Sequence, residues 1–413
     1  GFEKKPDWII FPALSYRKHG ELEQKQKLIS DKLSTLPFNR IIKGGRKGIA
    51  VSGISYLYAM EVIKEFDLDL TVFKVGTPYP LPLRLAQEFL SFVDQVMVVE
   101  ELDPVLEEQL LLVSAGKNEI FGKMTGDMPY NGEYSFESIK NTLLKFAGVE
   151  STDLVMIDIP KLPVRPPVLC AGCPHRASFY AAKTAAKNFE KTVYCGDIGC
   201  YTLGNAAPLN TVDTCLCMGA GITIAQGIKL AENGAKCIAF IGDSTFFHTG
   251  IPGIINAVYQ NTDITIAVLD NHTTAMTGGQ PHPGTGRTAM GMPAKPLDIE
   301  KILRACGVEH ISTVDPFKYE DTVDAFRSAM EHSGPSAVIA KAPCIALIKL
   351  PKSVRRVNEA CIGCLKCIKQ LGCPAMSVGK DGKVLINESI CTDCSLCVTV
   401  CPVGAIKRVD RNV

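Results

Sequence analysis

Residues 241–271 read IGDSTFFHTGIPGIINAVYQNTDITIAVLDN, and this stretch decides the fold of the second half of the chain. Two short apolar runs flank a helical pattern that begins at Ser244 and Thr245, which predicts one strand–helix–strand unit. The strands of such a unit are parallel and present their carboxyl ends at one edge of a sheet. Asp243 and Asn271 stand at those two ends, so we predict that they are neighbours.

The same alternation continues on both sides of this unit. The runs TVYCGDIG, KCIAFIGD, ITIAVLDN and SAVIAKAP, with helical segments between them, predict a doubly wound parallel sheet within residues 168–351. Three further strand and helix patterns between residues 48 and 115 predict a first domain of the same class, and a helix and a linker complete it to residue 167. Residues 352–413 are rich in Cys, Gly and Pro and predict a small third domain.

Composition excludes several classes of protein. The 413 residues carry a net charge of +1 with basic residues spread along the chain, which gives no case for nucleic acid or an acidic membrane surface. The apolar runs are far shorter than the roughly 20 residues of a membrane-spanning helix. No export signal is visible, and many of the 17 cysteines lie two residues apart, which favours metal or cluster ligation in a reducing cytoplasm over disulfides.

The tail contains two related cysteine runs, CIGCLKCIKQLGCP at 361–374 and CTDCSLCVTVCP at 391–402. Three thiolates spaced by two residues can hold three corners of a cubane, and in bacterial two-cluster ferredoxins the Cys before Pro ligates the other cluster. We therefore predict two [4Fe-4S] clusters, one held by Cys361, Cys364, Cys367 and Cys401, the other by Cys391, Cys394, Cys397 and Cys373. These predictions define an α/β chain with two doubly wound parallel-sheet domains and a bacterial-type two-[4Fe-4S] ferredoxin domain.

A pair of four-cysteine zinc sites is the alternative for the tail. It leaves the third Cys of each run and the Cys-Pro endings without a use, so clusters are favoured. Five residues rather than three precede Cys373, which predicts a longer loop in the first run.

Asp243 and Asn271 also predict a metal site. A carboxylate, an amide oxygen and a backbone carbonyl in the next loop form half of an octahedral oxygen shell that suits Mg²⁺, and a diphosphate can supply the rest. A Gly-Asp pair alone is weak, because it is often only a turn; the spacing to Asn271 and the TGGQ stretch beyond it strengthen the prediction.

Four more cysteines, Cys170, Cys173, Cys200 and Cys344, each stand at or near the end of an expected strand, on the same sheet edge as Asp243. They could converge there. The alternative is that they are buried small apolar residues, as some of the remaining cysteines must be.

At this point the chain resembles a known family, the α subunits of indolepyruvate ferredoxin oxidoreductases, which are thiamine-diphosphate-dependent 2-oxoacid:ferredoxin oxidoreductases. The resemblance runs nearly end to end, through FKVGTPYPLP, VVEELDPVLEEQL, CAGCPHRASFYA, GDIGCYTLG, CMGAGITIAQG, GDSTFFHTGI, DNHTTAMTGGQPHPG and the two-cluster tail. It implies a transketolase C-terminal-like domain at 48–167 and a domain at 168–351 that binds thiamine diphosphate and magnesium.

The resemblance also implies roles for particular residues. It carries magnesium ligation onto Asp243, Asn271 and the backbone oxygen of Thr273, and places the pyrophosphate against the turn of Gly242, Asp243, Ser244 and Thr245. It adds Gly219, Met276 and Thr277 to the cofactor site, and a third [4Fe-4S] cluster on Cys170, Cys173, Cys200 and Cys344. His175 is expected at the active site toward the substrate, with a structural histidine at a helix start as the alternative.

The implied reaction is oxidative decarboxylation of an arylpyruvate such as indole-3-pyruvate, with coenzyme A as acyl acceptor and ferredoxin as electron acceptor. A smaller β subunit is the implied partner in a hetero-oligomer. The alternatives are another 2-oxoacid substrate, a non-oxidative thiamine-diphosphate decarboxylase, and an electron carrier that binds no thiamine. Family members also carry an N-terminal domain with an activating Glu; residues 1–47 are too short for it and resemble a linker leaving it, so we expect this chain alone to be an incomplete enzyme.

Overall fold

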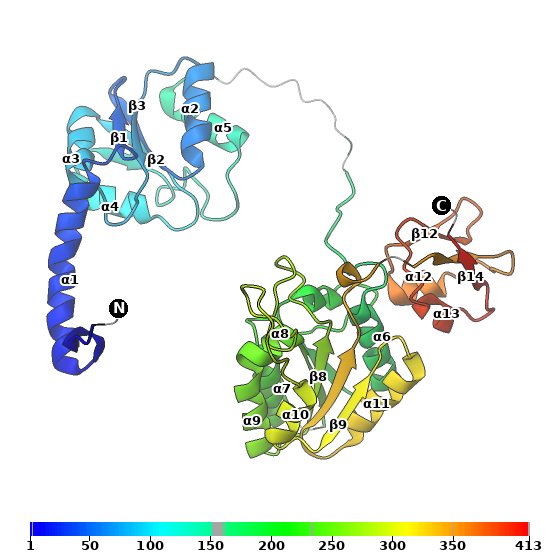
Figure 1. Cartoon of the computed structure of the whole chain (residues 1–413). Coiled ribbons are helices and arrows are strands. Elements are labelled where there is room, and N and C mark those ends of the chain that lie inside the picture. The colour runs from blue at the N-terminus through cyan, green and yellow to red at the C-terminus, as the bar shows by residue number, and fades with distance from the viewer. Residues whose placement is uncertain (2, 151–159, 161, 233, 350, 412–413) are drawn as a thin grey trace. The chain divides into compact units, whose positions relative to one another are not determined.

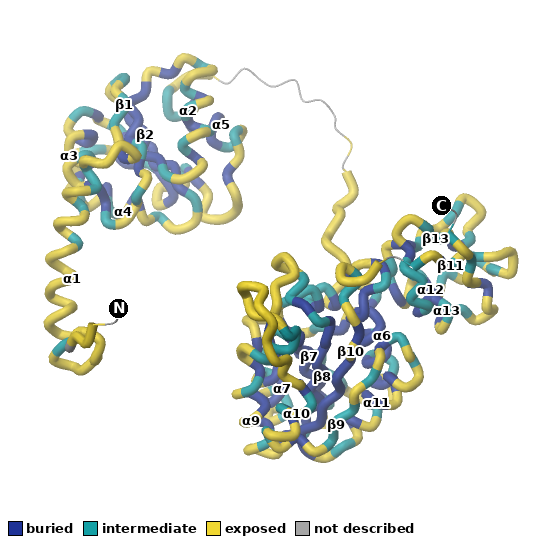
Figure 2. The backbone as a smooth tube through the Cα atoms, viewed as in Figure 1, coloured by how far each residue is buried: buried dark blue, intermediate teal, exposed yellow. Residues whose placement is uncertain are grey.

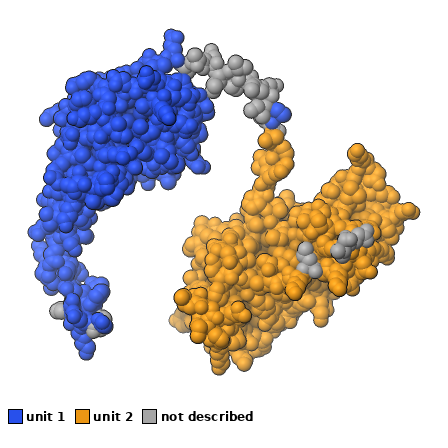
Figure 3. All heavy atoms as spheres, turned by 45° about the horizontal axis from the view of Figure 1, so that its top comes forward, with its two compact units in different colours: residues 1–161 blue, residues 162–413 orange. Residues whose placement is uncertain are grey.

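The computed structural model describes residues 1–413 except 2, 151–159, 161, 233, 350 and 412–413 (Figure 1). The chain divides into two compact units, residues 1–161 and 162–413 (Figure 3). The linker predicted before residue 168 falls partly on residues 151–159 and 161, which lie outside the described residues. Among the described helices, none has the length and apolar character needed to cross a membrane.

The first unit is built on a five-stranded sheet in the order β1-β3-β2-β4-β5. Its strands are β1 (Arg40–Ile42), β2 (Lys47–Ser52), β3 (Thr71–Val75), β4 (Gln95–Val99) and β5 (Glu119–Phe121). Its helices are α1 (Pro12–Leu33), α2 (Ser55–Glu65), α3 (Leu83–Phe92), α4 (Val105–Ser114) and α5 (Phe136–Ala147), after a 3-10 turn at Pro6–Trp8. One apolar cluster joins the sheet to α2 and α5, and a second joins it to α3 and α4, so the sheet is covered on both faces.

The second unit contains an all-parallel sheet in the order β6-β7-β8-β10-β9. Its strands are β6 (Thr192–Cys195), β7 (Lys236–Gly242), β8 (Ile264–Asp270), β9 (His310–Val314) and β10 (Ser336–Lys341). Helices α6 (Pro174–Ala186) and α11 (Tyr319–Glu331) pack on one face, and α7 (Ala220–Ala231), α9 (Ile251–Tyr259) and α10 (Ile299–Ala305) on the other. Strands β7 and β8 are buried along their length, as their unbroken apolar sequence requires (Figure 2).

Between β7 and α9 the chain forms the short helix α8 (Asp243–Thr245) and a π-helical turn, Phe246–Gly250. Such turns often occur at functional sites. Short 3-10 turns at Cys200–Asn205 and Ile345–Leu347 follow β6 and β10 at the same edge of the sheet.

The cysteine-rich tail packs against α6 in the same unit. Strand β11 (Ser353–Val357) pairs with β14 (Ile406–Asp410), and β12 (Met376–Val378) pairs with β13 (Val384–Ile386). Helices α12 (Lys366–Leu371) and α13 (Leu396–Val400) each begin after a residue with positive φ, Leu365 and Ser395, directly after the second Cys of a run. The apolar core of the tail includes Ala177 of α6.

Several expectations differ from the structure. Residues 1–47, expected to be a linker, contain α1 and β1, and β1 pairs antiparallel with β3, so the first sheet is mixed rather than purely parallel. The strand expected before Cys170 is wrong, because residues 162–170 form no strand and a turn leads directly into α6. The longer loop expected before Cys373 is only partly right: one of the two extra residues lengthens α12 to six residues, against five in α13, and the other is Gly372, with φ of +58°, between α12 and Cys373.

Phe89 of α3 tests the core of the first unit. Its ring is fully buried, packs on Phe73 at 5.3 Å and lies against Gly48, where a Cβ would approach to 2.6 Å. We expect Phe89→Ala to cost about 3–5 kcal/mol, because it leaves a cavity between helix and sheet. Hydrogen–deuterium exchange of β2 and β3 should accelerate, whereas Leu112→Ala on exposed α4 surface should leave it unchanged. Equal exchange in the two variants would contradict this packing.

Candidate functional site

Asp243 and Asn271 lie side by side at the carboxyl edge of the second sheet. The backbone N–H of Asn271 donates to Asp243 Oδ2 at 3.1 Å, and the N–H of Ser244 donates to Oδ1 at 2.8 Å. Both residues are buried. Adjacent ends of β7 and β8 therefore present a carboxylate and an amide at one point.

Hydrogen bonds fix the orientation of the Asn271 side chain. Its Oδ1 accepts from the backbone N–H of Thr273 at 3.1 Å, which leaves Nδ2 as the donor toward Nε2 of His175 at 3.1 Å. Burial lowers the pKa of His175 to about 4, so the ring is neutral near pH 7 and able to accept this bond. His175 also contacts the ring of Tyr201 edge-on at 5.7 Å. The structure thus places His175 behind Asn271, buried.

His282 approaches the same carboxylate from the loop after β8. Its Nδ1 accepts from the N–H of Gly284 at 3.2 Å, which puts the ring proton on Nε2, and Nε2 lies 3.1 Å from Asp243 Oδ2. The direction of this approach is poor for a hydrogen bond, so Nε2 is a buried donor without a well-aligned acceptor. The sequence alone does not single out His282, because its neighbours Pro281 and Pro283 read simply as loop.

Asp197 and Tyr201 support the predicted pyrophosphate turn. Asp197 is fully buried, burial raises the pKa of its carboxyl, and it accepts from the N–H of Gly219 and from the Tyr201 hydroxyl. The Tyr201 ring fills the space where Gly242 would carry a Cβ, and its hydroxyl lies 3.2 Å from Thr245 Oγ1. The sequence alone does not single out Asp197, although the stretch GDIGCYTLG that contains Cys200 also contains this carboxylate.

The other predicted cofactor residues differ in exposure. Gly219, which directly precedes α7, is buried and has φ of +87°, and a Cβ there would lie 2.5 Å from Oγ1 of Thr249. Thr273 is buried, whereas Met276 and Thr277 lie on an exposed stretch of the loop after β8.

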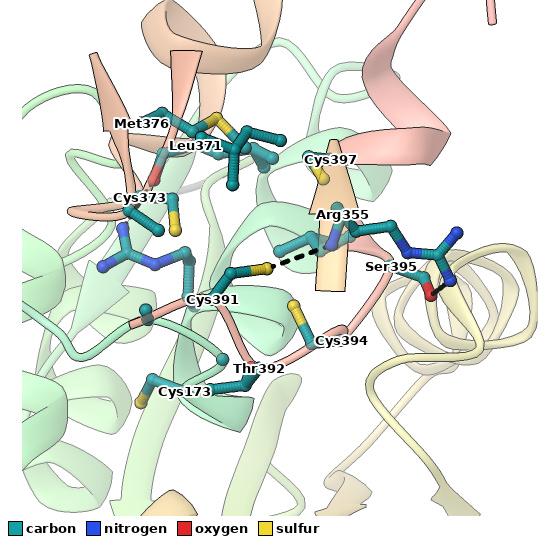
Figure 4. A pocket seen from close by; sticks show the side chains of 16 residues that line it. Cys173, Arg355, Leu371, Cys373, Met376, Cys391, Thr392, Cys394, Ser395 and Cys397 are labelled. Atoms are coloured by element: carbon teal, nitrogen blue, oxygen red, sulfur yellow. Dashed lines mark hydrogen bonds between the residues drawn. The ribbon is translucent and has the colours of Figure 1, made fainter. Parts of the chain in front are cut away.

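The structure gathers each predicted set of tail cysteines around its own cavity. Cys361, Cys364, Cys367 and Cys401 line one cavity with only apolar neighbours such as Val357, Val384 and Ile406. A second cavity is lined by Cys373, Cys391, Cys394 and Cys397, and also by Cys173 of the predicted inner set, as Figure 4 shows. Cys373 and Cys401 are therefore each grouped with the other run, in the crossed arrangement that the Cys-Pro endings predict.

Backbone groups point at the sulfurs of these cavities. The N–H of Arg355 donates to Cys391 Sγ at 3.4 Å, drawn as a dashed line in Figure 4, and the N–H of Ala405 donates to Cys401 Sγ at 3.2 Å. Burial raises the pKa of the Cys373, Cys394 and Cys397 thiols. Cluster binding must therefore release protons, since only thiolates ligate iron.

The four inner cysteines lie near the Asp243 edge. The pKa of the Cys200 thiol is raised by burial first, then by the neighbouring thiols of Cys344 and Cys170. Burial raises the pKa of Cys173 to about 12. The N–H of Cys344 donates to the carbonyl of Asn271 at 2.9 Å, so this cysteine is tied directly to the candidate magnesium site.

The inner loop and the tail are in direct contact. Gly172, between Cys170 and Cys173, has φ of +73°, and a Cβ there would overlap Oγ1 of Thr392. The N–H of Gly172 also acts as a hydrogen-bond donor that lowers the pKa of Cys373, against the larger effect of burial. The backbone of one cysteine loop therefore lies against the other.

The residues fit the groups that the sequence predicts. The adjacent oxygen donors of Asp243 and Asn271 match the preference of Mg²⁺ for hard oxygen ligands. Four tail cysteines around each tail cavity, with N–H donors to sulfur, match [4Fe-4S] ligation.

Two family models match this unit. Residues 197–340 match the thiamine pyrophosphate enzyme C-terminal TPP binding domain, and residues 384–407 match the 4Fe-4S binding domain. Both matches fall on the elements described above, the sheet edge with Asp243 and the tail.

Curated relatives are similar along nearly the whole chain. The chain is 39% identical to indolepyruvate oxidoreductase subunit IorA of Methanothermobacter thermautotrophicus, over 98% of this chain and 67% of that protein. It is 39% identical to the IorA subunit of Archaeoglobus fulgidus, over 100% of this chain and 68% of that protein. A 2-oxoglutarate synthase subunit KorB of Archaeoglobus fulgidus is 32% identical over 42% of this chain and 68% of its own length.

Among solved structures, the 2-oxoglutarate:ferredoxin oxidoreductase of Magnetococcus marinus is similar over 45% of this chain and 67% of that chain, with 21% identity and a TM-score of 0.39. The chain spans about two thirds of the length of the two IorA relatives.

Gly172→Ala tests the contact between the two cysteine loops. Because a Cβ must displace Thr392, we expect a loss of about 1–3 kcal/mol and a lower thermal unfolding temperature of the second unit. Gly382→Ala is the matched control, since Gly382 has φ of +76° with no atom near its Cβ position. Calorimetry on both variants separates the steric effect from the backbone effect; identical transitions would rule out a tight contact.

Proposed function

We propose that this chain, which belongs to the family of the IorA subunits of indolepyruvate oxidoreductase, carries both the decarboxylating site and the electron exit of an enzyme that oxidises arylpyruvates. The chain is an oxidoreductase of the thiamine diphosphate and [4Fe-4S] type. The proposed reaction converts indole-3-pyruvate or a related arylpyruvate and coenzyme A into the aryl-acetyl-CoA and CO2, with ferredoxin as electron acceptor.

One observation carries this proposal: Asn271 is bonded to both cysteine segments around it. Its side chain donates to His175, two residues after Cys173, and its carbonyl accepts from the N–H of Cys344. The candidate metal ligand and the candidate inner cluster ligands therefore share one hydrogen-bonded network. A decarboxylase that released its product without oxidation would have no use for this connection.

The residues of the sheet edge would hold the cofactor. When bound, thiamine diphosphate supplies the electron sink for decarboxylation of a 2-oxoacid, and the clusters supply one-electron acceptors. Asp243, Asn271 and the backbone oxygen of Thr273 would ligate Mg²⁺, and the Gly242–Thr245 turn with Gly219 would receive the pyrophosphate. Asp197 and Tyr201 hold that turn and Gly219 in place.

His175 has a positioning role in this proposal rather than a role on the substrate. It is buried, neutral near pH 7 and bonded to the Asn271 amide. By accepting from Nδ2 it keeps Oδ1 of Asn271 turned toward Thr273 and the metal position.

The order of the cysteine sets supports an exit for electrons through the tail. The inner loop contacts the Cys373 set through Gly172 and Thr392. Cys397 of that set lies near Cys367 of the last set. Burial is the main cause of the raised pKa of Cys397, and the Cys367 thiol raises it further. The three sets thus follow one another away from Asp243 within one unit. A smaller partner subunit and ferredoxin complete the proposed assembly.

Asp243→Asn tests the magnesium site. Removing the charge should weaken the Mg²⁺-dependent binding of thiamine diphosphate at least about tenfold. The affinity is measured by calorimetric titration of thiamine diphosphate into the complex of this chain with its partner subunit. Asp324→Asn, on the exposed side of α11, should bind as the unchanged protein does. Unchanged affinity in Asp243→Asn would place the metal elsewhere.

Reduction of a viologen dye tests the reaction itself. Dye reduction should require both an oxoacid and coenzyme A, and it should be fastest with arylpyruvates. Aldehyde release without dye reduction would overturn the proposal.

The iron and acid-labile sulfide content per chain tests the three cysteine sets. With four irons per cubane, about twelve irons per chain are expected under anaerobic purification. Cys344→Ser and Cys394→Ser should each remove about four irons. Cys237→Ser, a buried cysteine within β7, should remove none. About eight irons in the unmodified protein would show that the third cluster is absent, and an unchanged content in Cys344→Ser would show that Cys344 is not a cluster ligand.

A further inference from the structure

Arg176 is a buried cation between the two cysteine loops. It lies in the first turn of α6, three residues after Cys173 and directly after His175. Only 4% of its surface is exposed. It also lines the cavity formed by Cys373, Cys391, Cys394 and Cys397. A guanidinium at such a depth is costly unless its charge and its donors find partners.

Its hydrogen bonds tie the two loops together. Nη1 donates to the carbonyls of Leu371 at 2.5 Å and Gly372 at 3.0 Å, and Nη2 donates to the carbonyl of Leu169 at 2.5 Å. Leu169 directly precedes Cys170, and Gly372 directly precedes Cys373. One planar side chain therefore sets the separation of a cysteine in the inner loop from a cysteine in the tail.

The Nε atom of Arg176 is buried and has no partner in the described part of the chain. Backbone carbonyls satisfy the other nitrogens but do not balance the positive charge. Burial lowers the pKa of Arg176, and cysteine thiols act in the opposite direction, first among them Cys373. The unbalanced charge therefore lies beside the cysteines of the cavity that Arg176 lines.

The other tail cavity provides the contrast. The residues that line it are apolar apart from its cysteines, so it contains no matching cation. The second arginine that lines the Cys373 cavity, Arg355, has a carboxylate partner, Asp393, at 2.5 Å, and Arg408 contacts the same carboxylate at 2.9 Å. Arg176, which has no carboxylate partner among the described ion pairs, therefore contributes to making the two tail sites electrostatically unequal.

We propose that Arg176 is a positioning residue for the cluster held by Cys373, Cys391, Cys394 and Cys397, and that its buried charge raises the reduction potential of that cluster above the potential it would otherwise have. The inference rests on the proposed function, because it assumes that this site holds a [4Fe-4S] cluster. A fixed positive charge and an N–H donor toward sulfur both stabilise the more negative, reduced state. Electrons leaving the inner site would then collect first at the near tail site.

The test is a redox titration followed by electron paramagnetic resonance on the assembled protein. Cys394→Ser assigns the signal of the near cluster by removing it. Arg176→Met keeps a side chain of similar length and loses the charge. It should shift the reduction equilibrium of the near cluster at least tenfold toward the oxidised state, which lowers the reduction potential by about 59 mV for one electron. The signal of the Cys361 set should shift less. Arg304→Met, in an exposed ion pair on α10, is the control and should leave both unchanged.

Arg176→Lys separates charge from geometry, since it keeps the charge and loses the forked bonds to Leu371, Gly372 and Leu169. It should retain most of the potential while lowering the thermal stability of the second unit. If Arg176→Met does not assemble the near cluster, Arg176→Lys decides the test. Assembly in Arg176→Lys at close to the original potential supports the proposal, and loss of the near cluster in both variants overturns it. A potential unchanged in Arg176→Met with full iron content also overturns it. An unmodified protein without iron would instead refute the proposed function.

Discussion

The site depends on a single residue, Asn271, all of whose polar groups are committed. Its N–H binds the Asp243 carboxylate, its side-chain oxygen accepts from Thr273, its amide donates to His175, and its carbonyl accepts from Cys344. These bonds come from four separate segments of the chain. They exist because two adjacent parallel strands, β7 and β8, end at the same level. The sheet register therefore determines the geometry of the candidate metal site and of the cysteines beside it.

Much of this arrangement follows from the sequence. The apolar runs of β7 and β8 are continuous, and a parallel pair must bring their ends together, so the adjacency of Asp243 and Asn271 is predictable. The crossed grouping of Cys373 and Cys401 follows from the Cys-Pro endings, read with the ligation pattern of bacterial two-cluster ferredoxins. The short strands β1, β5 and β9 were not expected, because three to five residues at the side of a sheet carry little periodic signal.

Other features depend on tertiary structure and leave no local pattern. The turn before α6 reads as an apolar strand end, but no neighbouring strand is available to pair with it. The roles of Asp197, His282 and Arg176 arise from segments brought together only in the fold: Arg176 bonds residues 195 and 196 positions away. The sequence shows the chemistry of such side chains but not the partners that complete it.

The separation between Arg176 and Gly372 has a consequence for biosynthesis. The carbonyl that Arg176 needs emerges from the ribosome 196 residues later, which at roughly 5–20 residues per second corresponds to on the order of ten to forty seconds. Until then the loop of Cys170 and Cys173 lacks the surface that covers Gly172. A nascent chain thus presents the thiols of Cys170 and Cys173 well before the segment that covers their loop has been synthesised.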